Sequence, residues 1–392
     1  MVPDPKCART PLPSGGLTIR TLPSGPLYLW ELAGDKNLSS AVLQNVSIVN
    51  DSEAPLALRS VTFEVMRGDT LVQMRNFTAS ELEEYAGYMH GSQQQGVIDA
   101  YNFVFRPDLL LGEGCSLSPT TSLAPGQGLF LASHAILTPE GCDRLRINAE
   151  AAGDDGREVQ SATELRLTEY QAKNAYCFPV NGTWYVSAGA DFFSGHRWVV
   201  CQEFGLDLVR LGESGGFHTG RGLTVESHYG YGSEVMATAD GIVVKAVDRF
   251  PDSSNRLPGE SESNEEHWGR LLATASEWLV GEPARAAGNH VLISHDGGEY
   301  SLYGHLQPES ISVEEGEHVQ AGRVIGRLGH SGNSPFPHLH FHVCDGEDFM
   351  YARTLPVKFS NISVLQRPTV TGYLHTGDIV STHCARAKDP MY

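Results

Sequence analysis

Three histidines alternate along a short segment near the C-terminal end of the chain, Pro337-His-Leu-His-Phe-His-Val343. In a β-strand alternate side chains point to the same face, so His338, His340 and His342 would share one face and apolar residues the other. Catalytic zinc takes three His, Asp or Glu ligands and keeps a fourth position for water. Histidines beside such an ion can transfer protons or stabilise an oxyanion. The segment therefore predicts one zinc ligand and a neighbouring catalytic histidine.

Two further segments carry side chains that could join this cluster. Tyr303-Gly-His-Leu306 ends a predicted strand, in which alternation puts His305 on the face of Tyr303. Earlier, Asp207 lies in Phe204-Gly-Leu-Asp-Leu208, with apolar residues on the opposite face. A carboxylate on a polar strand face is usually only solvated, but beside a histidine cluster it becomes a candidate ligand. Because zinc lowers the pKa of bound water from about 15.7 to about 7, the predicted chemistry is hydrolysis.

The region before these segments contains no comparable cluster. Fourteen of the sixteen histidines lie from His196 onward. Before that point, runs such as Val61-Thr-Phe-Glu-Val65 alternate apolar and polar residues between turn signals, a pattern typical of an antiparallel sandwich. Thr78-Ala-Ser-Glu81 is a capping-box pattern that predicts one helix over residues 79–89. We expect this first region to be a binding or spacer module.

Strands must also position the histidines of the second region. His290-Val-Leu-Ile-Ser-His295 reads as a strand, and Asp296-Gly-Gly298 predicts a hairpin turn after it. The β-rich pattern is interrupted between residues 249 and 287, where apolar residues at helical spacing follow a polar loop. The expected divisions are a flexible lead-in (1–26), an immunoglobulin-like sandwich (27–171), a linker (172–189), a second β domain (190–358) with a helical insertion (249–287), and a tail (359–392).

Composition supports the prediction of an all-β chain with two domains and disfavours several functions. The chain has 392 residues, with 42 glycines and 21 prolines, so turns are frequent and long helices are not expected to dominate. A net charge of −19 argues against a nucleic-acid partner, which needs a basic surface. No apolar run is long enough to predict a membrane span, and the first residues lack the apolar segment of a secretory signal. The residues predict no oligomeric state.

The motifs of the second region occur in a recognisable order. The run from His290 to Leu306 is followed by Val313-Glu-Glu-Gly-Glu-His-Val319 and then by Pro337-His-Leu-His-Phe-His-Val343. Over about residues 190–350 this resembles the lysostaphin-type (LytM-like) zinc metalloendopeptidases, which cut peptide cross-links of bacterial peptidoglycan. The resemblance implies the antiparallel β fold of that family, one zinc ion and a location in the cell envelope or outside the cell.

The resemblance also implies a role for each matching residue. His340 and Asp207 match zinc ligands, and His338 and His305 match the two catalytic histidines. The family's first ligand usually stands four residues before the aspartate, where this chain has Glu203. His196, eleven residues before Asp207, is our preferred first ligand if its loop folds back; Glu203 and His218 are the alternatives. His342 is expected to have a supporting or partly exposed position.

The function that follows is zinc-dependent hydrolysis of amide bonds in peptidoglycan cross-links or stem peptides. The zinc set would be His196, Asp207 and His340, with His305 and His338 handling protons and the oxyanion. The alternative is a catalytically degenerate envelope protein of the same fold that binds cell wall or activates another hydrolase. The intact histidines favour the enzyme, and the displaced first ligand favours the alternative.

Overall fold

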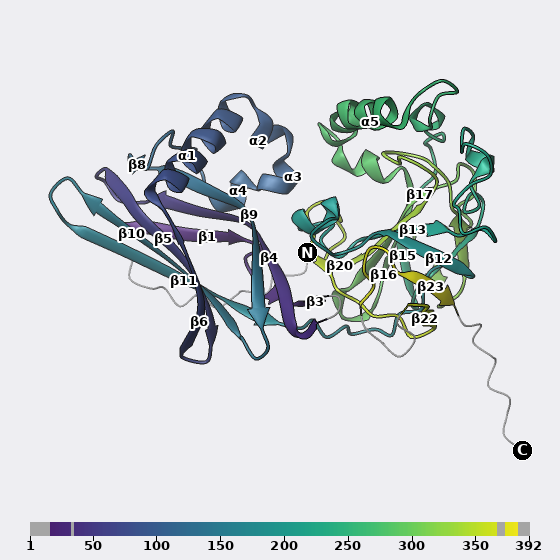
Figure 1. The fold of residues 1–392 in the computed structure, drawn as a ribbon, viewed down its shortest axis with the longest axis horizontal. Helices are drawn as coiled ribbons and strands as arrows, with labels where there is room; N and C mark the ends of the chain where they lie inside the picture. Colours follow the sequence, from purple (N-terminus) through teal and green to yellow (C-terminus); the bar gives the residue numbers. More distant parts are fainter. Residues whose placement is uncertain (1–15, 33–34, 367–372, 383–392) are drawn as a thin grey trace, which may run out of the picture. The chain divides into compact units, whose positions relative to one another are not determined.

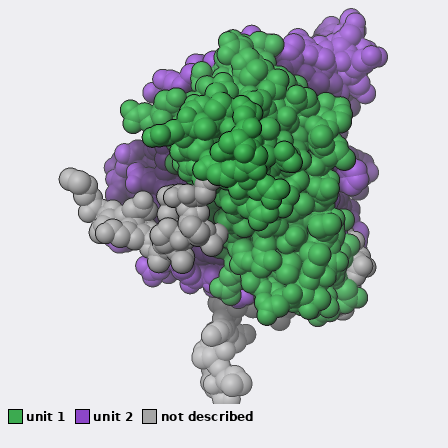
Figure 2. Space-filling view, turned by 90° about the vertical axis from the view of Figure 1, so that its left-hand side faces the viewer, with its two compact units in different colours: residues 1–29, 37–168 green, residues 30–36, 169–392 purple. Residues whose placement is uncertain are grey.

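The computed structural model describes residues 16–32, 35–366 and 373–382, which divide into two compact units (Figure 2). The N-terminal unit comprises residues 1–29 and 37–168, and the C-terminal unit comprises residues 30–36 and 169–392. Both are built mainly from β-strands, so the all-β class is confirmed (Figure 1). Among the described residues, no helix combines the length and apolar character needed to cross a membrane.

The N-terminal unit is a β-sandwich with a helical segment. Its strands are β1 (Leu17–Leu22), β2 (Leu27–Tyr28), β4 (Asp35–Asn50), β5 (Leu56–Arg67), β6 (Thr70–Phe77), β7 (Ser116–Leu117), β8 (Ser122–Leu123), β9 (Gln127–Pro139), β10 (Arg144–Gly153) and β11 (Glu158–Thr168). One sheet has the order β1–β4–β9–β7, and the other has β2–β11–β10–β5–β6 with β8 beside β5. The long neighbouring strands of both sheets pair antiparallel.

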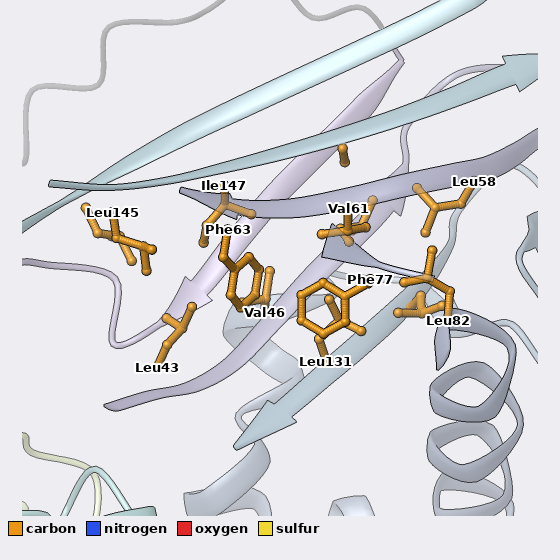
Figure 3. Packing of buried hydrophobic residues seen from close by; sticks show 14 of the residues in the cluster. Leu43, Val46, Leu58, Val61, Phe63, Phe77, Leu82, Leu131, Leu145 and Ile147 are labelled. Atoms are coloured by element: carbon orange, nitrogen blue, oxygen red, sulfur yellow. The ribbon is translucent and has the colours of Figure 1, made fainter. Parts of the chain in front are cut away.

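The core of this unit lies between the two sheets. Phe63 on β5 and Ile147 on β10 point from one sheet toward Leu43 and Leu131 on the other (Figure 3). All four side chains are buried. The alternation that predicted the strands therefore sorts these apolar side chains inward, where burial of each stabilises the fold by about 1.5–3 kcal/mol.

The predicted helix is present in the N-terminal unit and is longer than expected. It is α1 (Ala79–Gln94), followed by the short helices α2 (Val97–Ala100), α3 (Asn102–Phe105) and α4 (Pro107–Leu110). The Thr78 hydroxyl accepts from the Glu81 amide at 3.3 Å, and the Glu81 carboxylate accepts from the Thr78 amide at 2.8 Å. The capping box is thus confirmed, and it satisfies two amides that the first helical turn cannot.

The C-terminal unit is organised around a ten-stranded sheet. The strands of the whole unit are β3 (Trp30–Leu32), β12 (Thr183–Ala188), β13 (Leu206–Arg210), β14 (Glu234–Met236), β15 (Gly241–Val247), β16 (Asn289–Ser294), β17 (Tyr300–Leu306), β18 (His318–Val319), β19 (Val324–Arg327), β20 (Leu339–Cys344), β21 (Thr354–Leu355), β22 (Ile362–Val364) and β23 (Ile379–Thr382). Sheet order is β18–β15–β16–β17–β20–β13–β12–β23–β22, with β21 beside β20, and β14 pairs with β19. The predicted hairpin is confirmed as β16 and β17.

Helical segments of the C-terminal unit lie outside this sheet. The helix expected in the insertion is α5 (Asn264–Leu279), drawn in green in Figure 1. Short 3₁₀ turns are η1 (Gly195–Trp198), η2 (Val225–Ser227), η3 (Ser254–Arg256), η4 (Pro283–Ala287) and η5 (Asp296–Gly298). The turn η1 carries His196, and η3 and η4 flank α5.

Three segments expected to be irregular contain strands, which corrects the predicted divisions. Residues 17–22 of the lead-in form β1, which pairs along its length with β4. The predicted linker contains β12, and the predicted tail contains β22 and β23; all three join one side of the ten-stranded sheet. Such short strands depend on hydrogen-bond partners far away in the sequence, which local composition does not reveal. Residues 1–15, 367–372 and 383–392 lie outside the described residues.

Three adjacent strands bring residues of the predicted site together. In the antiparallel pairs, His340 on β20 lies opposite Asp207 on β13 and opposite Gly304 on β17. Side chains directly opposite each other in such pairs point to the same face. Register therefore brings the carboxylate of Asp207 to the imidazole of His340, although 133 residues separate them in sequence.

Candidate metal centre

Three side chains from three segments converge beside the centre of the large sheet. Asp207 and His340 come from β13 and β20, and His196 comes from η1, where the Ser194 hydroxyl accepts from the His196 amide at 3.2 Å. One ligand atom from each residue lies within 4.8 Å of the others. His340 Nδ1 is 2.9 Å from Asp207 Oδ1, and His196 Nε2 is 3.5 Å from Asp207 Oδ2. The loop ahead of the aspartate thus folds back and brings His196 to the site.

The chemistry of this group fits zinc. Two imidazoles and one carboxylate are a common donor set, and ligands about 2.1 Å from a tetrahedral ion lie about 3.4 Å apart. Burial alone would raise the pKa of the Asp207 carboxyl, but His196 and His338 hold it well below its usual value. Burial lowers the pKa of His196. An ionised carboxylate and a neutral imidazole are the forms that bind a metal. Among the described residues, no other group of three possible ligands meets this spacing.

A glycine leaves the room that this convergence needs. A side chain at Gly205 would begin 3.2 Å from His340 Cε1 and 3.4 Å from His196 Nδ1. The Gly205 carbonyl lies 3.4 Å from His196 Nδ1. A proton on Nδ1 would leave Nε2, the nitrogen nearer Asp207, free to bind a metal. The residue between Phe204 and Leu206 therefore contributes through its small size and its backbone.

His338 and His305 lie beside the three candidate ligands. Their ring centroids are 4.6 Å apart, and His338 Nε2 is 3.5 Å from Asp207 Oδ1. His338 Nδ1 is 2.7 Å from the Phe336 carbonyl, and His305 Nδ1 is 2.8 Å from the Ser331 carbonyl. A proton on each Nδ1 would be donated to these carbonyls, so that Nε2 of both rings would be free to exchange a proton.

His305 reaches the site by a route that alternation did not predict. Tyr303 packs on the apolar face against Phe341, with ring centroids 5.4 Å apart, and regular alternation would put His305 on that face too. Instead His305 has a left-handed backbone, with φ of 61°, and its ring lies 6.0 Å from that of His340. The expected shared face with Tyr303 is therefore wrong. A non-glycine residue in this conformation costs about 1–3 kcal/mol and is often found at functional sites.

The remaining protonation equilibria depend on burial and on Asp207. Burial lowers the pKa of His305, with a further decrease from the neighbouring His338 and His340. Burial would also lower the pKa of His338, but the adjacent Asp207 carboxylate raises it above its usual value. The two neighbouring imidazoles thus differ in proton affinity in the metal-free structure.

The two alternative first ligands lie elsewhere. Glu203 is 1% exposed and pairs with the buried Arg197, with 2.8 Å between Oε1 and Nη1. His218 contacts His228, with ring centroids 5.3 Å apart. The compact group contains His196 and neither alternative.

Glu203→Ala is expected to destabilise the C-terminal unit without removing its metal. The change removes the ion pair that Glu203 makes with the buried Arg197 guanidinium, and breaking such a buried pair costs about 3–5 kcal/mol. Chemical denaturation measures the free energy of unfolding, and metal analysis gives the zinc content. Glu314→Ala, at an exposed glutamate, is the control. A folded Glu203→Ala protein without zinc would instead identify Glu203 as a ligand.

His342 contacts the candidate ligand that its strand carries. It is 2% exposed, so the expectation of partial exposure is wrong, and its Nδ1 lies 3.0 Å from His340 Nε2. If His340 binds a metal through Nδ1, its proton must be on Nε2 and would be donated to His342. His342 is therefore placed to orient the ligand ring and to select its tautomer.

Replacing His342 should weaken zinc binding. Without an acceptor at this point, His342→Phe is expected to lower zinc affinity about 10–100-fold, while His342→Asn keeps an acceptor near the Nδ1 position and should restore part of it. Competition with a chromophoric chelator measures the affinity. His290→Phe is the matched control, since His290 is also buried but bonds to the Gly288 carbonyl. Equal affinities in all three variants would exclude the orienting role.

Sequence reasoning missed the groups that hold the two catalytic candidates. The carbonyls of Ser331 and Phe336 accept from His305 and His338, and the Ser334 hydroxyl lies 3.1 Å from His338 Nδ1 and 2.9 Å from His330 Nδ1. Carbonyl acceptors leave no signal in residue types, because every residue has one. The small residues of Ser331-Gly-Asn-Ser334 were the only available hint.

Comparison with known proteins confirms the resemblance for the C-terminal part of the chain. Residues 272–350 match the model of Peptidase family M23. The DD-carboxypeptidase/endopeptidase Mpg of Neisseria meningitidis serogroup B is 46% identical over 56 residues, which are 14% of this chain and 12% of that protein. The chain therefore spans about an eighth of the length of this curated relative.

Solved structures were also matched. The catalytic domain of the antimicrobial peptidase lysostaphin from Staphylococcus simulans is 19% identical, covers 44% of this chain and 88% of that one, and has a TM-score of 0.25. A variant of the catalytic domain of the prophage-encoded M23 protein EnpA from Enterococcus faecalis is 16% identical, covers 47% and 95% of the two chains, and has a TM-score of 0.28.

Proposed function

Since the chain carries a Peptidase family M23 domain at residues 272–350, we propose that it is a zinc-dependent endopeptidase acting on amide bonds in peptidoglycan cross-links or stem peptides. The observation that carries the proposal is the group of His196, Asp207 and His340 beside two further histidines. The substrate class implies that the protein acts in the cell envelope or outside the cell.

His196 Nε2, an Asp207 oxygen and His340 Nδ1 would hold the ion. Zinc bound there would polarise the scissile carbonyl and lower the pKa of a bound water to about 7. Three protein ligands leave a fourth position, which catalytic zinc sites require and closed structural sites lack.

His338 and His305 would handle protons in the proposed reaction. The carbonyls of Phe336 and Ser331 accept from Nδ1, so Nε2 of each ring can accept a proton from the attacking water. The protonated ring can then donate that proton to the amine that leaves the substrate. While it carries the proton, its Nε2–H can also donate to the developing oxyanion. Both side chains are at most 7% exposed, which limits competing water around them.

Two measurements on the purified full chain test this function. Metal analysis should find one zinc ion per chain, and purified cell walls should release peptide fragments with new amino termini. The degenerate alternative predicts wall binding, or activation of an added hydrolase, without release by this chain alone. Its main argument was the unusual spacing before Asp207, and the proximity of His196 to Asp207 weakens that argument. Zinc-loaded protein that releases no peptide from any wall type would contradict the proposal.

A further inference from the structure

The helical insertion forms a cavity that the proposed chemistry does not use. It has a volume of about 450 Å³, within the range of ligand-binding pockets. Three arginines contribute to its lining: Arg256 from η3, Arg270 from α5 and Arg285 from η4. Trp278 provides an aromatic wall, and Arg285 lies 5.9 Å from the centroid of its ring. In a chain with a net charge of −19, a cavity with three guanidinium groups is unusual.

Two of these arginines already have carboxylate partners. Arg270 makes a bidentate pair with Glu262, at 2.9 and 2.8 Å. Arg285 lies 3.9 Å from Glu282, and its side chain is 48% exposed. The Glu262 pair neutralises Arg270 directly, whereas the contact between Arg285 and Glu282 is longer and more exposed to solvent.

Arg256 is different, because its buried charge has no acidic partner in direct contact, and the Glu277 carboxylate acts on it only from a longer distance. It is 5% exposed, and it donates from Nε to the Ser334 carbonyl at 3.1 Å and from Nη1 to the Thr274 hydroxyl at 3.2 Å. Both acceptors are neutral, and no carboxylate of the described residues lies within 4.0 Å of its guanidinium. A buried charge without a counter-ion in contact is costly, and a guanidinium fits a carboxylate in a bidentate manner.

Arg256 also connects the cavity to the proposed catalytic histidines. The residue whose carbonyl it binds, Ser334, places its hydroxyl 3.1 Å from His338 Nδ1. Ser334 would therefore be the only residue between an anionic group bound at Arg256 and the His338 ring, which we propose transfers protons.

We propose that this cavity is a subsite for a carboxylate of the peptide substrate, bound by Arg256 and supported by Arg285 and Trp278. The proposal rests on the proposed peptidase function, because it takes the anion from the same substrate. A phosphate group shares the anionic chemistry, but Glu277 in the lining repels a dianion more strongly than a carboxylate. The subsite would select peptides that present a free carboxylate at a fixed distance from the cleaved bond.

Binding of three probes to the full chain tests the subsite. His338→Ala protein, loaded with zinc, keeps the probes intact during calorimetry. The probes are a short alanine peptide with a free C-terminal carboxylate, the same peptide as its C-terminal amide, and inorganic phosphate. We expect the carboxylate peptide to bind about 10–100-fold more tightly than the amide, the range for hydrogen bonds to a charged group. Phosphate should bind more weakly than the carboxylate peptide.

Variants test whether the cavity causes the preference for the carboxylate peptide over the amide. Arg256→Gln should remove it, and Arg285→Gln, at a half-exposed position where folding is not at risk, should reduce it. Glu277→Gln should strengthen carboxylate binding, because a repelling charge is lost. Arg323→Gln, at a 52% exposed arginine paired with Glu317, is the matched control and should change nothing. Equal binding of carboxylate and amide, loss of the preference in the control, or tighter binding of phosphate would each overturn the subsite.

Cleavage of a longer peptide, compared with binding of the short probes, separates this proposal from the peptidase function. If the active protein cleaves the carboxylate and amide forms of a longer peptide with the same KM, the subsite is wrong and the peptidase stands. If neither form is cleaved but Arg256→Gln still removes a carboxylate preference, the binding site stands and the peptidase function is wrong.

Discussion

Replacing His338 by alanine is expected to abolish peptide release from cell walls while zinc stays bound. In the proposed mechanism this ring takes a proton from the attacking water and returns it to the leaving amine, a contribution of about 10²–10⁴-fold to the rate. The ring is 2% exposed, and its Nδ1 lies 2.7 Å from the Phe336 carbonyl. Water that fills the space left by the ring is a far weaker base than imidazole, so it does not replace the lost function. The three candidate ligands are untouched by the change, so the metal content should remain at one ion.

Two measurements on the same preparation check this prediction. Release of new amino termini from purified walls gives the activity, and metal analysis gives the zinc content. His318→Ala, at an exposed histidine on β18, is the control and should behave as the unmodified protein does. Full activity in His338→Ala would overturn the assignment of this residue, and simultaneous loss of zinc would make it a ligand.

Replacing His340 by alanine is expected to remove the zinc itself. His340 Nδ1 faces Asp207 in the centre of the candidate site, and its loss leaves only two protein ligands. Because a change to a residue that merely supports a ligand already costs about 10–100-fold in affinity, loss of a ligand should cost at least about 100-fold. Both zinc content and peptide release should fall to background.

Thermal unfolding provides a second measurement of zinc loss in His340→Ala. A metal that binds only the folded state stabilises it by mass action, so a chelator should lower the unfolding temperature of the unmodified C-terminal unit. The chelator should have no effect on His340→Ala. His196→Ala should behave in the same way, and His218→Ala should keep its zinc, because His218 contacts His228 instead. Zinc loss in His218→Ala with retention in His196→Ala would reverse our choice of first ligand.

Much of the fold follows from local patterns in the chain. Alternation of apolar and polar residues predicted strands such as β5 and β10, and the Thr78–Glu81 capping box predicted the start of α1. The turn at residues 296–298 predicted the hairpin of β16 and β17. In each case the signal and the structure involve residues within a few positions of each other, and the physical cause acts over the same short range.

Long-range pairing was less accessible to sequence reasoning. The strands β12, β22 and β23 were expected to be linker or tail, because short segments carry little periodicity. They become strands through pairing with each other, as when Thr183 aligns with Ser381. The β12–β23 pair joins segments almost as far apart as the unit is long in sequence, and β22 joins the sheet through β23.

The chain by itself determined which residue types could bind a metal and which side chains share a face where a strand is regular. His340 and His342 lie on one face of β20 because side chains alternate along a regular strand, and His338 directly precedes that strand. Tertiary structure alone decided that Asp207 lies opposite His340, that His196 folds back to them while Glu203 pairs with Arg197, and that the backbone at His305 turns its ring toward the site. Those outcomes depend on register, loop path and packing between distant segments, which no local spacing specifies.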